Sequence, residues 1–176
     1  SHLGGAANLL RLGDARDALR MLQAADPWVT SAAQLSEVVW ARGLEALANL
    51  RLGNDADARR IADDVLPKIV GNRPVAYWTQ QSNAAVAEVY LELWERSPDD
   101  AKLKAAAKSA CKGVKMFAGV FPFGEPHAWL WRGCWLWQAG KTDKGRRHLE
   151  RAIERADAMQ THWEGARARY ELGRRL

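Results

Sequence analysis

Apolar residues recur along this chain at the spacing of amphipathic helices, in segments separated by turn residues. Gly13, Gly53, Gly140 and Gly173 each follow such a segment, and glycine readily adopts the left-handed conformation that ends a helix. After three of these glycines, small and apolar residues return at the same offsets. The three copies are Ala18-x3-Leu22-x2-Ala25, Ala58-x3-Ala62-x2-Val65 and Gly145-x3-Leu149-x2-Ala152. We expect each copy to be the second helix of a hairpin, packed closely on the first.

This repetition predicts an all-α fold without strands, in which antiparallel hairpins stack into a right-handed α-solenoid. We expect one domain over residues 1–176 with about four and a half hairpins. The predicted hairpins lie at about 4–26, 31–70, 75–118 and 126–160, and a last unpaired helix covers 162–176.

The predicted helix boundaries depend on capping residues and proline. Ser31 and Thr161 each have Gln or Glu three residues later, which is the capping-box pattern. Asp26-Pro27 is expected to end the helix that begins near Asp14, because proline lacks the backbone N–H that a helix interior uses. The full set of predicted N-caps is Asp14, Ser31, Asn54, Ser97, Thr142 and Thr161.

Tryptophan is unusually frequent, and four of the nine tryptophans crowd the segment 127–139. This segment is apolar on every side, which is typical of a helix buried between its neighbours. Trp131 and Trp135 stand about one helical turn apart, and we expect them in the core. For Trp129 and Trp137, a place in the lining of a groove is nearly as well supported as a core position.

The composition, with 48% apolar and 27% charged residues, is ordinary for a globular protein. The sequence contains no run of about 20 apolar residues, so it predicts no membrane-spanning helix. The first residues lack the basic and apolar regions of a signal peptide. We therefore expect a cytoplasmic protein, and the abrupt ends suggest a piece of a longer chain. Cys111 and Cys134 have no metal-type spacing and are predicted to be buried free thiols.

The net charge is +5, and residues 141–176 hold ten Lys and Arg against six Asp and Glu. This excess could attract an acidic partner, although a solvated helix face is the stronger interpretation. Glu150 and Glu154 stand one turn apart, but arginines surround them as on an exposed salt-bridged helix. No phosphate-binding loop, metal-type His or Cys spacing, or activated nucleophile occurs. We therefore predict no catalytic residue, metal site, cofactor or enzymatic activity.

The unit that begins at Trp129 has small and apolar residues at a characteristic series of positions. They are Trp129, Gly133, Leu136, Gly140, Gly145, Leu149 and Ala152, and the first unit has Ala6, Leu9, Gly13, Ala18, Leu22 and Ala25. Both series resemble the tetratricopeptide repeat. The turn glycines lie 40, 87 and 33 residues apart, mostly longer than that family's period of about 34. The resemblance implies divergent tetratricopeptide-like hairpins, with HEAT-like helix pairs as the competing class.

A narrower likeness depends on four segments, at 87–94, 121–126, 131–133 and 170–174. With them, residues 75–176 resemble the C-terminal helical-repeat tail of bacterial multidomain regulators. In those proteins a nucleotidyl cyclase or protein kinase domain precedes an NTPase module. No cyclase or NTPase motif occurs in this chain, so the resemblance implies a regulatory appendage of a signalling protein rather than the catalytic activity of its parent.

A stack of hairpins offers a shaped surface rather than a reaction centre. We therefore predict a non-catalytic protein-interaction or regulatory module, whose partner is another domain of its own chain or an oligomer partner. Arg132 either reaches the rim of the groove or pairs with a buried acid such as Glu125. In tetratricopeptide stacks the first helix of each hairpin lines the groove. The candidate binding residues, from this geometry and from the tryptophan-rich segment, are Trp40, Leu47, Tyr90, His127, Trp129, Leu130, Arg132 and Trp137.

Two other functions remain open at this point. The first is a small-molecule sensor that controls an attached catalytic domain, with a pocket formed by His127, Trp129, Arg132 and Trp137. The second is a basic nucleic-acid-binding module that uses the helices of residues 142–176. This second function has less support, because the sequence has no recognition motif and no interleaved exposed aromatic residues. We expect no membrane partner.

Overall fold

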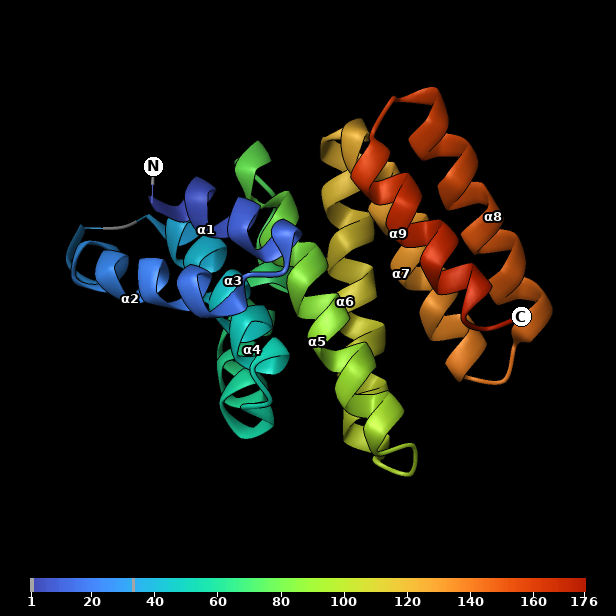
Figure 1. The fold of residues 1–176 in the computed structure, drawn as a ribbon, viewed down its shortest axis with the longest axis horizontal. Coiled ribbons are helices and arrows are strands. Elements are labelled where there is room, and N and C mark those ends of the chain that lie inside the picture. The colour runs from blue at the N-terminus through green and yellow to red at the C-terminus, as the bar shows by residue number, and fades with distance from the viewer. Residues whose placement is uncertain (1, 33) are drawn as a thin grey trace.

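A computed structural model describes residues 2–32 and 34–176 of the chain. Within these ranges the chain forms nine α-helices and two short 3-10 helices, and it contains no strand (Figure 1). The prediction of an all-α fold is therefore confirmed for the described residues. The elements are α1 (His2–Leu12), α2 (Ala15–Ala32), α3 (Leu35–Arg51), α4 (Asp55–Val70), η1 (Tyr77–Thr79), α5 (Gln80–Arg96), α6 (Ala101–Val120), η2 (Pro122–Gly124), α7 (Glu125–Gln138), α8 (Thr142–Ala158) and α9 (His162–Gly173).

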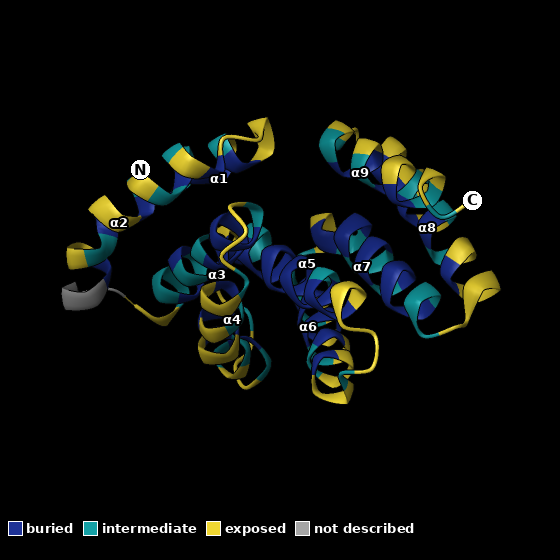
Figure 2. Ribbon diagram, turned by 60° about the horizontal axis from the view of Figure 1, so that its bottom comes forward, coloured by how far each residue is buried: buried dark blue, intermediate teal, exposed yellow. Residues whose placement is uncertain are grey.

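The helices pack in a regular order. Each helix contacts the next one along the chain, and each odd-numbered helix also contacts the next odd-numbered helix. Figure 2 shows that α1 and α9 lie on one side of α3, α5 and α7. A single cluster of buried apolar residues includes members of all nine α-helices. None of the described helices is long and apolar enough to cross a bilayer.

Three of the four predicted turn glycines have the left-handed backbone that such turns require. Gly13, Gly53 and Gly140 have φ values of 87°, 81° and 78°, which a residue with a side chain adopts only with strain. Gly173 is different, because it is the last residue of α9 and has no positive φ. The turn between α8 and α9 contains no glycine, and its left-handed residue is Gln160, with a φ of 57°.

The predicted N-caps are only partly correct. Asp14 caps α2, since its Oδ1 accepts a hydrogen bond from the backbone N of Asp17 at 3.0 Å. Asn54 and Thr161 occupy the N-cap positions of α4 and α9, but neither side chain caps its helix. Thr142 lies inside α8, whose N-cap is Lys141.

Two predicted caps were misplaced by about three residues. The first turn of α6 is capped by Asp100, which accepts hydrogen bonds from the backbone N of Lys102 and Leu103, and not by Ser97. The capping box of α3 begins at Gln34, whose backbone N donates to Glu37 at 2.9 Å. Ser31 belongs to the end of α2, and its side chain lies outside what the structure describes.

The predicted break at Asp26-Pro27 does not occur, and α2 continues through both residues to Ala32. Proline in a helix removes one backbone hydrogen bond and crowds the preceding turn. The apolar residues on either side, Ala25 and Val29, are buried, and their packing offsets that cost. The first predicted hairpin therefore ends about six residues later than expected, and the second begins at Leu35 instead of residue 31.

Helices α7 and α8 lie in close contact where two glycines face each other. A Cβ added to Gly133 would lie 2.9 Å from Cγ of Leu149 and 3.1 Å from the carbonyl oxygen of Gly145. A Cβ added to Gly145 would lie 2.8 Å from the backbone N of Trp137. All three distances are shorter than van der Waals contact, so the two backbones approach only because these positions lack side chains.

Gly145→Ala is expected to lower the free energy of unfolding by about 1–3 kcal/mol, because the added methyl group overpacks the α7–α8 contact. Gly119→Ala is the matched control, since nothing lies within 4 Å of a Cβ at this helical position of α6. The control is expected to be more stable than the parent by about 0.5–1 kcal/mol. Urea denaturation of the three proteins measures both effects, and equal stability of the two variants would contradict the close contact.

Candidate functional site

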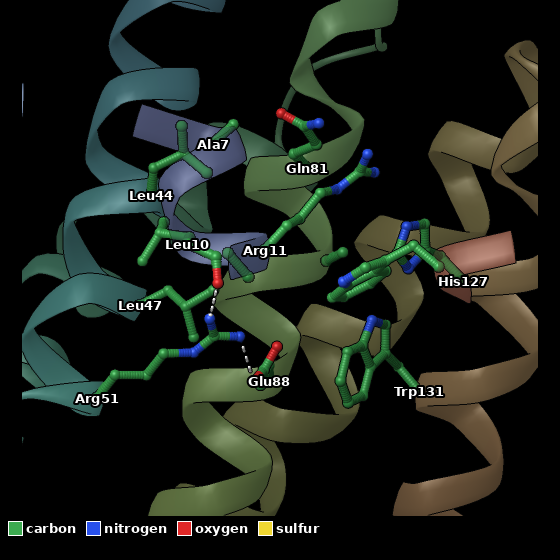
Figure 3. A pocket seen from close by; sticks show the side chains of 13 residues that line it. Ala7, Leu10, Arg11, Leu44, Leu47, Arg51, Gln81, Glu88, His127 and Trp131 are labelled. Carbon is green, nitrogen blue, oxygen red and sulfur yellow. Dashed lines mark hydrogen bonds and ion pairs between the residues drawn. The ribbon is translucent and has the colours of Figure 1, made fainter. Parts of the chain in front are cut away.

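The main candidate site is a groove in which all five odd-numbered helices meet (Figure 3). The groove is lined by α1 and α9 as walls and by α3, α5 and α7 beneath them. Small and apolar side chains cover much of it, including Leu10, Leu47, Ala84 and Trp131. Its cavity has a volume of about 40 Å³, which is room for one or two water molecules.

Two buried carboxylates and one arginine join α9 to α5 beside this groove. Glu88 of α5 and Glu171 of α9 are only 3% and 2% exposed. Nη2 of Arg167 lies 3.2 Å from Oε1 of Glu88 and 3.0 Å from Oε1 of Glu171. A buried carboxylate is costly unless it has an ionic partner. Arg167 therefore compensates an acid on each helix at once.

The end of α9 strengthens the same network. Arg174 donates two hydrogen bonds to Glu95, at 2.8 and 2.9 Å, and a third to Glu171 at 2.7 Å. Arg175 also donates to the carboxylate of Glu171. Burial raises the pKa of Glu171, but the charges of Arg167 and Arg175 outweigh it, so this pKa lies below its ordinary value. Glu171 is therefore a carboxylate at neutral pH.

The opposite wall, α1, is held by arginine as well. Arg51 of α3 donates one hydrogen bond to the carbonyl oxygen of Leu10 and another to Glu88 at 3.2 Å (Figure 3). The same carbonyl group accepts a hydrogen bond from the backbone N of Gly13 at 3.2 Å, so Arg51 is its second donor and connects the end of α1 to α3. Glu88 contacts arginines from both α3 and α9, and so it links the two sides of the groove.

At the start of α9 the two walls touch each other. Arg11 of α1 donates to Oε1 of Glu164 at 3.1 Å, and its guanidinium lies 5.2 Å from the ring centre of Trp163. The same Glu164 oxygen is 3.3 Å from Nε2 of His127, which is close enough for an ion pair when the ring is protonated. Burial raises the pKa of Glu164, and His127 and Arg11 together bring it below its ordinary value.

Some buried polar groups at the groove have no partner. Nε1 of Trp131 and both ring nitrogens of His127 make no hydrogen bond within the described part of the chain. The contact of His127 with Glu164 is close, but it does not have the alignment of a hydrogen bond. Both residues are 2% exposed and line the groove. Because an unpaired buried donor is unfavourable, Nε1 of Trp131 and Nδ1 of His127 fit a ligand that offers acceptor atoms, whereas Nε2 of His127 already faces Glu164.

The structure places two of the predicted binding residues, Leu47 and His127, in the groove. Trp131 is buried as predicted, and it also lines the groove. Leu130 and Tyr90 are buried in the core instead. The hydroxyl of Tyr90 donates to Asp63 at 2.6 Å, and burial together with this carboxylate raises its pKa.

The other predicted residues lie elsewhere. Trp129 and Trp137 face α8, where the ring of Trp129 stacks against His148 and a Cβ on Gly145 would touch Trp137. Trp40 packs near Trp78 of η1, with 6.5 Å between the ring centres. The pocket predicted from His127, Trp129, Arg132 and Trp137 does not form, because His127 lines the groove whereas Trp129 and Trp137 face α8.

Of the two alternatives left open for Arg132, the pairing with Glu125 does not occur. Glu125 accepts a hydrogen bond from Arg155 at 2.7 Å. The guanidinium of Arg132 lies instead 4.6 Å from the ring centre of Trp135, and Trp135 is buried as predicted. A charged group over an aromatic face is a favourable contact that leaves the charge able to meet a further partner.

The sequence does not predict Arg11, Arg51 and Trp163 in the groove, or Arg167 beside it. Arg11, Arg51, Arg167 and Trp163 come from three helices and have no common motif. The sequence does indicate a role for Glu88, because it is the first acid in a long apolar stretch of α5. The structure shows that its side chain is buried. An isolated acid in such a stretch predicts a buried ion pair.

The cysteines are buried and free, as predicted. Burial raises the pKa of the Cys111 thiol to about 12 and that of Cys134 further still. Both thiols are therefore protonated and unreactive at neutral pH. Within the described ranges, no group of three or more His, Cys, Asp or Glu side chains could hold a metal ion.

No protein family, curated protein or solved structure matches this chain. The fold and the groove are therefore defined by the residues of the chain itself. The likeness to tetratricopeptide repeats and to the tails of bacterial regulators stays a prediction.

Arg167→Met is expected to lower the free energy of unfolding by about 1–3 kcal/mol, because it removes the cation shared by two buried carboxylates while Arg51 still faces Glu88 and Arg174 and Arg175 still face Glu171. Arg169→Met is the control, two residues later in α9, and it breaks an exposed pair with Asp157. Its expected effect is below about 1 kcal/mol. Denaturation followed by circular dichroism compares the two, and a similar loss in both would show that the buried network contributes little.

Proposed function

We propose that this protein is a non-catalytic interaction module whose groove binds an extended segment of a partner protein. One observation carries the proposal: five helices from all along the chain converge on one groove that contains buried donors without acceptors. A backbone carbonyl or a carboxylate of the partner would accept from Trp131 and His127.

We interpret the order of the helices as a right-handed, tetratricopeptide-like α-solenoid of about four and a half hairpins. Contacts between successive odd-numbered helices support this interpretation, as do the left-handed turns at Gly13, Gly53 and Gly140. The close approach of Gly133 and Gly145 also occurs where the repeat pattern puts small residues. In this arrangement the odd-numbered helices are the first helices of their hairpins and form the binding face.

The partner segment would belong to another domain of the same signalling protein or to an oligomer partner. The likeness of residues 75–176 to the tails of bacterial cyclase and NTPase regulators favours such a regulatory role in the cytoplasm. A groove with charged walls suits reversible binding of a regulatory segment. Charged contacts give specificity for the partner, and their strength changes with salt more than that of a closed apolar interface.

A small-molecule sensor has less support. Binding sites for small molecules usually enclose about 300–1,000 Å³, whereas the groove has a cavity of about 40 Å³. A molecule of metabolite size would have to displace α1 or α9, and with them the ion pairs of Arg11 and Arg51.

Filling the groove tests the proposal. Peptides selected for binding to the parent protein from a random library should lose at least about tenfold in affinity for Gln81→Trp, since Gln81 lines the groove. They should bind Ala56→Trp unchanged, because Ala56 is an exposed position on α4. A library that yields no binder, or peptides that bind both variants equally, would contradict a peptide-binding groove. Isothermal titration calorimetry measures the affinities.

A further inference from the structure

The positive charges that lack an acidic partner gather in one part of the molecule. Of the 26 Lys and Arg residues, 15 lie within ion-pair distance of an Asp or Glu in the described part of the chain. Only two of the other eleven, Arg16 and Arg73, lie outside the region from α6 to α8. The remaining nine are Lys102, Lys104, Lys108, Lys112, Lys115, Arg132, Lys141, Lys144 and Arg147.

The lysines of α6 form a stripe. Lys104, Lys108, Lys112 and Lys115 follow one another at intervals of four, four and three residues, and all are exposed. This spacing places them on one face of the helix, about 6 Å apart, over a length of about 16 Å. The helix contains no Asp or Glu. Four neighbouring like charges without counterions create a positive potential that attracts anions.

The stripe continues onto α7 through two buried indoles. Nζ of Lys104 lies 5.7 Å from the ring centre of Trp94, and Nζ of Lys108 lies 5.7 Å from that of Trp135. Arg132 of α7 lies over the same Trp135 ring, at 4.6 Å. Two cations thus contact the same indole ring, and a cation–π contact leaves each charge able to meet a further anion. We call Lys104, Lys108, Lys112, Lys115 and Arg132 the basic stripe.

The basic stripe differs from the segment that the sequence suggested. Residues 141–176 have ten Lys and Arg, but all except Lys141, Lys144 and Arg147 are paired with acids within the described residues. A solvated, salt-bridged face is thus the better description of most of that segment. The unpaired charge lies mainly on α6, where the overall charge balance gives no special signal.

We propose that the basic stripe binds the phosphodiester backbone of a nucleic acid without reading its sequence. A line of point charges about one helical turn apart matches a polyanion with regularly spaced phosphates, and lysine contacts phosphate as a simple charge. The indoles of Trp94 and Trp135 are 4% and 7% exposed, so they are not available to stack on bases. Recognition is therefore confined to charge, and the affinity depends strongly on salt.

The surroundings of the stripe favour nucleic acid over a membrane or an acidic peptide. Membrane-surface helices insert large apolar side chains beside their basic residues, but α6, α7 and α8 contain no exposed large apolar residue among those described. The two main cavities are not lined by the stripe, so a peptide would find no pocket for its side chains there. This surface is separate from the groove, so either proposal can fail without the other.

Fluorescence anisotropy with labelled single-stranded and duplex DNA of about 20 nucleotides, between about 50 and 200 mM salt, tests the proposal. The parent protein should bind both, with an affinity that falls steeply with salt. The variant Lys108→Gln/Lys112→Gln/Lys115→Gln should bind about tenfold or more weakly at the lowest salt. The slope of log K against log salt should decrease by about 2–3, because three phosphate contacts are lost.

The matched control is Arg20→Gln/Arg60→Gln/Arg169→Gln, which removes the same charge from three exposed ion-paired arginines. The control should bind within about twofold of the parent protein, and circular dichroism checks that both variants are folded. Failure of the parent protein to bind DNA overturns the proposal. So does equal weakening in both triple variants. Tighter binding of polyglutamate, or of vesicles of phosphatidylcholine with phosphatidylserine, would assign the stripe to a peptide or a membrane instead.

Discussion

The arrangement of this protein depends on two buried acids that share one arginine. Glu88 and Glu171 lie on different helices, and Arg167 contacts both at 3.2 and 3.0 Å. A buried carboxylate is costly without cationic partners, and Arg167 adds to those that each acid already has, Arg51 at Glu88 and Arg174 with Arg175 at Glu171. The last helix, which packs on α8 and α7, is thereby also connected to α5, and it forms the second wall of the groove.

The first wall is fixed by the same kind of contact. Arg51 joins the end of α1 to Glu88, and Arg11 joins α1 to Glu164 across the mouth of the groove. The floor is apolar packing, whereas both walls are held by arginine. This division has a physical consequence: the floor is rigid, but the walls respond to salt, to pH and to a competing charged partner.

The elements that the sequence predicted well are those with local causes. Three turn glycines, the Asp14 cap and the buried Trp131 and Trp135 follow from residues close together in the chain. The helix break predicted at Pro27 does not occur, because the burial of Ala25 and Val29 outweighs the backbone hydrogen bond that proline removes from α2. The groove could not be predicted in the same way. Arg11 and Glu164 are 153 residues apart, and only the stacking of the helices brings them together.

Amide hydrogen exchange along α9 tests the buried network most directly. If Arg167 and its two carboxylates hold α9 in place, its amides between Gly165 and Glu171 should exchange about as slowly as those in the middle of α5. Exchange should become fast in α9 when Arg167 is replaced by Met, while α7 and α8 stay protected. Rapid exchange throughout α9 in the parent protein, as for a fraying terminal helix, would contradict this account.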